Sequence, residues 1–168
     1  MNVEHNRTRR LSLGAGIRNQ GCVCGKVTAR LHFHPAVGML TPQEHLENLV
    51  RHIELVREAC LLLGRRLMAQ GRLEFGRLLI ARGFEHDVSK FYGIEWDYLH
   101  AGRDVPREEL ELAIKQHTRS NSHHPEYWGG IDKMPEIALA EMVCDWYARG
   151  QEFGTGLRDW IQEVAIER

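Results

Sequence analysis

The chain has 168 residues, of which 43% are hydrophobic, so a folded globular protein is expected rather than a disordered one. Its 22 Lys and Arg residues nearly balance 23 Asp and Glu residues, and a formal net charge of -1 argues against a general nucleic-acid binder. No apolar run approaches the ~20 residues of a membrane span, and no signal-peptide core follows the basic N-terminus. We therefore expect a cytoplasmic protein whose partner is a small molecule and not a membrane.

Residues 1–38 differ from the rest of the chain, being rich in Arg, Gly and Asn and lacking sustained periodicity. We interpret them as a poorly ordered, flexible extension that precedes a single domain at 39–168. Four residues in this segment could instead form a zinc site, although their spacing is not a usual CxxC pattern: Cys22, Cys24, His32 and His34.

The domain itself is predicted to be helical throughout. Residues 41–44, TPQE, form a capping box with proline at the first helical position, and they predict a helix to about Ala69. Residues 121–130 hold Pro125, Gly129 and Gly130 and are expected to be a loop. Further helices are predicted at 73–81, stopped by Gly83, around 95–100, from Pro106 past His117, at 135–150 and at 157–166. Without strand-like alternation, these segments predict an all-α fold, a single bundle of about six helices.

Seven side chains able to ligate a metal are strung along this domain, each in or beside an apolar helical segment. Imidazole and carboxylate are ligands that zinc, iron, manganese and nickel favour. A buried aspartate is costly unless something compensates its charge, and a cation is one such compensation. The set predicts a site for one or two divalent transition-metal ions: His52, His86, Asp87, His117, His123, His124 and Asp145.

The adjacent pair His86-Asp87 constrains this interpretation. Neighbours on a helix point about 100° apart, so both can reach one ion only near a helix end or bend, which Gly83 suggests. An aspartate can bridge two cations with its two oxygens. The alternative is that Asp87 is simply the N-cap of a following helix.

Three motifs in order carry a resemblance to a known family: HDVSK at 86–90, NSHHPEYW at 121–128 and EMVCDW at 141–146. The chain resembles the HD superfamily of metal-dependent phosphohydrolases, named for its His-Asp pair. It is most similar to a group of small HD-like proteins of bacteria and phages with HDxSK, NxHHPEYW and EMxCDW motifs. Residues 128–130, WGG, stand where the HD-GYP phosphodiesterases have GYP, which argues against a cyclic-dinucleotide substrate.

The resemblance implies a ligand set for each of two ions. The first ion would be held by His52, His86, Asp87 and Asp145, and the second by Asp87, His117, His123 and His124. His45 lies on the same helical stripe as His52, and we interpret it as a residue that packs or that supports a ligand.

It also implies substrate contacts. Lys90 is the candidate for gripping a phosphate, with Arg119 as a second, although most lysines are merely solvated. Tyr127 and Trp128 could stack on a base or pack as core aromatics. Glu141, one turn before Asp145, could orient a ligand histidine.

The function implied is hydrolysis of a nucleotide or other small phosphoester by a metal-activated water. His123 or His124, whichever is not a ligand, would protonate the leaving oxygen. Two alternatives share the fold and the ligands: a di-iron oxygenase of the HD type, and a non-catalytic module that binds a metal or nucleotide.

Overall fold

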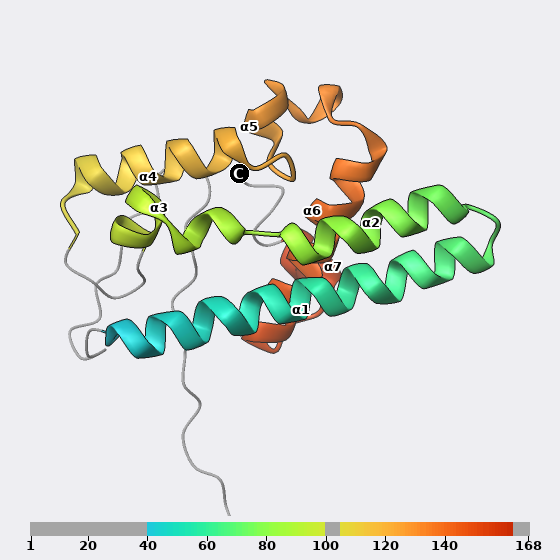
Figure 1. Cartoon of the computed structure of the whole chain (residues 1–168), viewed down its shortest axis with the longest axis horizontal. Helices are drawn as coiled ribbons and strands as arrows, with labels where there is room; N and C mark the ends of the chain where they lie inside the picture. Colours follow the sequence, from blue (N-terminus) through green and yellow to red (C-terminus); the bar gives the residue numbers. More distant parts are fainter. Residues whose placement is uncertain (1–39, 100–104, 163–168) are drawn as a thin grey trace, which may run out of the picture.

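The computed structural model describes residues 40–99 and 105–162, and these residues form an all-helical bundle without a strand, as predicted (Figure 1). The expected N-terminal extension, with its Cys and His set, lies outside the described residues. The bundle has seven α-helices and two short 3₁₀ helices within the described ranges. The additional helix, α5 (Pro125–Trp128), lies in the segment expected to be a loop.

The capping box at the start of α1 (Pro42–Ala69) is present. Thr41 Oγ1 accepts a hydrogen bond from the backbone N–H of Glu44 at 3.2 Å, and Thr41 N donates to Glu44 Oε2 at 2.7 Å. The cap and Pro42 together explain why this helix boundary could be read from the sequence.

The second helix, α2 (Leu73–Glu85), folds back along α1 to form a helical hairpin (Figure 1). The prediction that Gly83 stops this helix is wrong, because α2 continues through Gly83 to Glu85. Gly83 is buried against α1, where a Cβ atom would lie 2.7 Å from Cys60 Cβ. A Cβ on Gly64 would likewise lie 2.7 Å from the carbonyl oxygen of Gly76. These glycines therefore serve close helix packing.

The remaining elements follow the hairpin in the chain. Beyond α2 come η1 (Val88–Phe91), α3 (Gly93–Tyr98), α4 (Arg107–Ser120), α5, η2 (Ile131–Lys133), α6 (Glu136–Phe153) and α7 (Leu157–Trp160). Helix α4 runs alongside α3, and α6 crosses the α1–α2 hairpin (Figure 1). The expected end of α6 near Gly150 is three residues short, because Gly154 supplies the left-handed residue that ends the helix.

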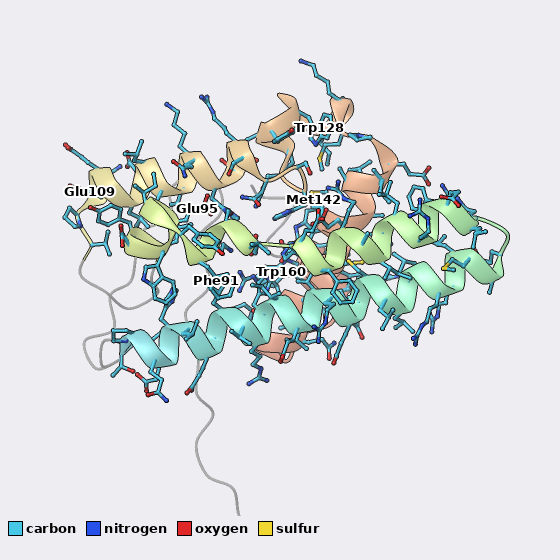
Figure 2. The ribbon with its side chains drawn as sticks, viewed as in Figure 1. Phe91, Glu95, Glu109, Trp128, Met142 and Trp160 are labelled. Carbon is cyan, nitrogen blue, oxygen red and sulfur yellow. The ribbon has the colours of Figure 1, made fainter. Side chains whose placement is uncertain are left out.

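Two apolar clusters hold the helices together. The larger joins α1, α2 and α6 through Val56, Ala59, Cys60, Leu79, Cys144 and Ala148. The smaller contains Met142 and packs against Trp128, and both are labelled in Figure 2. Helix α6 belongs to both clusters, so its position is fixed along most of its length.

Replacing Gly83 with alanine tests the close packing of the hairpin. Alanine at a helical glycine ordinarily stabilises a protein by up to ~1 kcal/mol. Here the added methyl group would overlap Cys60, and we expect Gly83→Ala to lower the free energy of unfolding by about 1–3 kcal/mol. Chemical denaturation would measure the change, and a stabilised variant would contradict the packing described.

Candidate metal centre

The fold brings all seven predicted ligands into one buried cluster. They come from α1, the α2–η1 junction, α4, the segment before α5, and α6. His124 and Asp145 are partly exposed and the other five are buried. Their ligating atoms form three overlapping groups, each with its atoms within 4.8 Å of one another: His52, His86 and Asp87; His86, His123 and Asp145; and His117, His123 and His124.

The Asp87 carboxylate lies at the centre of the cluster, and its two oxygens face different pairs of imidazoles. Oδ2 lies 3.5 Å from His52 Nε2 and 3.6 Å from His86 Nε2. Oδ1 lies 3.4 Å from Nε2 of both His117 and His123. One carboxylate thus joins two halves of the site.

The backbone at Asp87 explains how adjacent residues reach one site. Asp87 has φ 56° and is the one non-glycine residue with positive φ in the described part of the chain. It separates the end of α2 from the start of η1, so the expected bend is confirmed. Its side chain makes no capping hydrogen bond to η1 and turns into the cluster. A left-handed backbone conformation at a residue other than glycine costs about 1–2 kcal/mol, and the contacts of the Asp87 side chain must offset that cost.

Four buried ligand atoms have no hydrogen-bond partner among the described residues: His52 Nε2, His86 Nε2, Asp87 Oδ1 and Asp145 Oδ1. They approach one another and the neighbouring ligands only at ion-pair distances, such as 3.2 Å between His52 Nε2 and Asp145 Oδ1. An unsatisfied buried polar atom costs about 1–3 kcal/mol. Cations bound on the two sides of Asp87 would satisfy these atoms, so the donor set fits a metal ion.

The opposite nitrogen of each buried imidazole faces a glutamate. His52 Nδ1 lies 3.0 Å from Glu152, His86 Nδ1 3.0 Å from Glu141, and His117 Nδ1 2.8 Å from Glu95. A carboxylate at Nδ1 favours the tautomer that leaves the Nε2 lone pair free for a metal. This arrangement is the usual support for histidine ligands.

Two of these glutamates were missed by sequence reasoning. Glu152 lies seven residues after Asp145 on the same helix, a spacing that places both on one face and that could have revealed it. Glu95, labelled in Figure 2, comes from the short helix α3 and has no comparable signal. Glu141 was expected to orient a histidine, and it contacts His86.

A small polar network holds Glu95 in place. Ser89 Oγ donates to Glu95 Oε2 at 2.7 Å, and Asn121 Nδ2 donates to Ser89 Oγ at 2.9 Å. Ser89 belongs to HDVSK and Asn121 begins NSHHPEYW. The non-ligand residues of the two motifs therefore act together through Glu95 to fix His117.

The charged state of the cluster follows from its burial and its mixed charges. Burial raises the pKa of the Asp87 carboxyl, but Lys90 and the neighbouring imidazoles outweigh it and hold that pKa well below the usual range. Burial and Arg149 lower the pKa of His52, but the surrounding carboxylates outweigh them and raise it to about 10. Without a metal, His52 is therefore protonated at neutral pH, and metal binding would displace that proton.

The two histidines of NSHHPEYW behave differently from His52. Burial is the main cause that lowers the pKa of His123 well below its ordinary value and that of His124 to about 4. Both rings are neutral at pH 7, the state in which an imidazole ligates a metal. His124 Nε2 also lies 3.0 Å from His117 Nε2. These properties favour ligand roles over the expected proton-donor role.

The candidate substrate-binding residues differ in burial and in their distance from the cluster. Lys90 is buried, and its Nζ donates to Asp87 Oδ2 at 2.7 Å, so it is not a solvated lysine. Arg119 is exposed on α4, two residues past His117, so it projects away from the cluster. Trp128 donates to the Ser122 carbonyl at 2.8 Å and packs in the core, whereas Tyr127 is exposed.

The fold and the site define an all-helical protein with a buried histidine–aspartate cluster that could hold a metal ion. The model of a family of unknown function, DUF5662, matches residues 41–168, and the chain belongs to this family. No curated protein and no solved structure matches the chain. Among the described helices, none is both long and apolar enough to cross a membrane.

Substitutions in the His-Asp pair test the ligand assignment. We expect Asp87→Ala and His86→Ala to abolish metal binding, because Asp87 faces both halves of the cluster. His45 packs its ring against Trp96, with centroids 5.2 Å apart, and His45→Ala should retain metal. Elemental analysis of each purified variant would give the metal-to-protein ratio. If Asp87→Ala kept the metal-to-protein ratio of the wild type, the assignment of Asp87 as a ligand would be refuted.

Proposed function

We propose that the protein is a binuclear metal-dependent phosphohydrolase of the HD type, acting on a nucleotide or another small phosphoester. The observation that carries the proposal is the Asp87 carboxylate, whose two oxygens each face a separate pair of imidazole Nε2 atoms. The resemblance of the HDVSK, NSHHPEYW and EMVCDW motifs to the HD superfamily supports it.

The donor set divides between two ions that share Asp87. His52, His86 and Asp145 would complete the first site with Asp87 Oδ2, and His117, His123 and His124 would complete the second with Oδ1. Histidine and carboxylate donors suit manganese, iron, nickel or zinc. When bound, such ions supply Lewis acidity and lower the pKa of a coordinated water to near neutrality.

The charges around the cluster support an anionic substrate. The cluster contains five carboxylates and three cationic side chains: Asp87, Glu95, Glu141, Asp145 and Glu152, with Arg82, Lys90 and Arg149. With every imidazole in the neutral form that ligates a metal, these carboxylates and cations sum to a charge of about -2 before the charge of the ions is added. Two divalent ions would reverse the sign, so the loaded site would attract a phosphate group.

Lys90 is the side chain best placed to contact that phosphate. Its ammonium group is held 2.7 Å from Asp87 Oδ2, next to the atoms that would ligate the ions. A fixed cation at this position would stabilise negative charge that develops on phosphoryl oxygens, without reorganising during the reaction. Arg119 has no comparable position, since it is exposed and projects away from the cluster.

A metal-loaded protein should hydrolyse at least one member of a phosphoester panel, and Lys90→Ala should lower that turnover. We expect a decrease of roughly ten- to a thousandfold, the range for losing one charge-stabilising contact, with unchanged metal content. Arg119→Ala removes a cation that faces away from the site and serves as the matched control.

The same experiment distinguishes the alternatives. If Lys90→Ala leaves turnover unchanged, Lys90 does not contact the phosphate during the reaction. Oxygen uptake by the iron-loaded protein, without phosphate release, would favour a di-iron oxygenase. Thermal stabilisation by a nucleotide with no turnover would favour a binding module.

A further inference from the structure

Glu141 differs from the other glutamates of the cluster because it faces two histidines. Its Oε1 lies 3.0 Å from His86 Nδ1 and 3.5 Å from His123 Nδ1. Glu95 faces His117 and Glu152 faces His52, each contacting one imidazole Nδ1. His86 and His123 fall on opposite sides of Asp87, against Oδ2 and Oδ1 respectively.

The second oxygen of Glu141 is held by Arg82 of α2. Arg82 Nη2 contacts Glu141 Oε2 at 2.5 Å and donates to Ser122 Oγ at 2.7 Å. Arg82 thereby joins α2, α6 and the residue immediately before His123. A charge-assisted contact of this kind is stronger and more directional than a neutral hydrogen bond.

We propose that Glu141, clamped by Arg82, is a single positioning carboxylate that serves both metal ions, whereas Glu95 and Glu152 each serve one. This inference rests on the proposed binuclear centre and adds the residue pair that aligns its two halves. Glu141 Oε1 hydrogen-bonds with His86 Nδ1 and lies at ion-pair distance from His123 Nδ1, so loss of its charge loosens a ligand of each ion.

The surroundings of Glu141 indicate that such a loss would affect metal affinity more than folding. Arg82, Glu141, His86 and His123 line a polar cavity of about 170 Å³, together with Ser122 and Asn121. A cavity of this size and polarity can hold water. In a variant without the Glu141 charge, such a water could hydrogen-bond to Nδ1 of His86 or His123 but would not fix the orientation of the ring. The apolar clusters do not include Glu141 or Arg82.

The test compares three neutralising substitutions in the full chain: Glu141→Gln, Glu95→Gln and Glu152→Gln. Binding of Mn²⁺ would be followed by equilibrium dialysis with elemental analysis, which separates the affinities of the two ions. Loss of a carboxylate behind a ligand histidine typically lowers metal affinity by about 10–100-fold. We expect Glu141→Gln to lower both affinities, and each control to lower only one.

Substitutions of Arg82 provide a second, independent test. Arg82→Ala should lower the affinity for both ions, as Glu141→Gln does. Arg82→Lys, which keeps the charge, should retain part of that affinity. The unfolding temperature of each metal-free variant would show that the effect is not a loss of fold. If Glu141→Gln fails to fold, the Arg82 pair decides.

The outcomes separate this inference from the proposal beneath it. A wild-type protein that binds fewer than two Mn²⁺ ions would overturn both. The shared role of Glu141 alone would be overturned if the wild-type protein binds two ions and Glu141→Gln or Arg82→Ala lowers the affinity for only one of them, or for neither. Weakening of both ions by Glu95→Gln or Glu152→Gln would overturn it too.

Discussion

The burial of the Asp87 carboxylate is the constraint on which the rest of the site depends. It is 1% exposed, and its backbone adopts a left-handed conformation that few aspartates take. An isolated buried carboxylate would be protonated or would destabilise the fold. Here four imidazoles and the Lys90 ammonium surround it, and they keep it ionised. The helices can be understood as the frame that brings these groups to one point.

The frame achieves this with two layers of polar contacts. Asp87 and the imidazole Nε2 atoms form the inner layer, and glutamates at the Nδ1 atoms form the outer one. Ser89 and Asn121 then hold Glu95, and Arg82 holds Glu141. Each layer fixes the orientation of the layer inside it, as expected of a site that binds a metal with defined geometry. Close packing at Gly83 and Gly64 keeps α1 and α2 at the separation this requires.

Most of the helical frame could be predicted because its signals are local. The capping box at Thr41 and the prolines before α4 and α6 mark helix starts directly. The prediction at Gly83 was wrong because the residue type alone does not distinguish a glycine that ends a helix from one that lets a neighbouring helix pack closely. The short helix α5 was missed because four residues that begin with a proline and are followed by two glycines are also typical of a loop.

The ligand set could be proposed because the motifs lie in a known order, and the structure brings all seven residues together. Their supporting glutamates depend on tertiary contacts. Glu95 reaches His117 across 22 positions with no local pattern to join them, and Glu152 reaches His52 across 100, so its spacing from Asp145 is its only local signal. Burial, which the sequence does not show, separates Lys90 from the second candidate Arg119, because Lys90 is buried and Arg119 is exposed.

Anomalous X-ray diffraction from crystals grown with Mn²⁺ would locate any bound ions and show whether two of them share Asp87. If Asp87 is shared by two ions, two anomalous peaks will appear, one on each side of it: the first among His52, His86 and Asp145, and the second among His117, His123 and His124. A single peak, or peaks away from Asp87, would contradict the sharing of Asp87 by two ions.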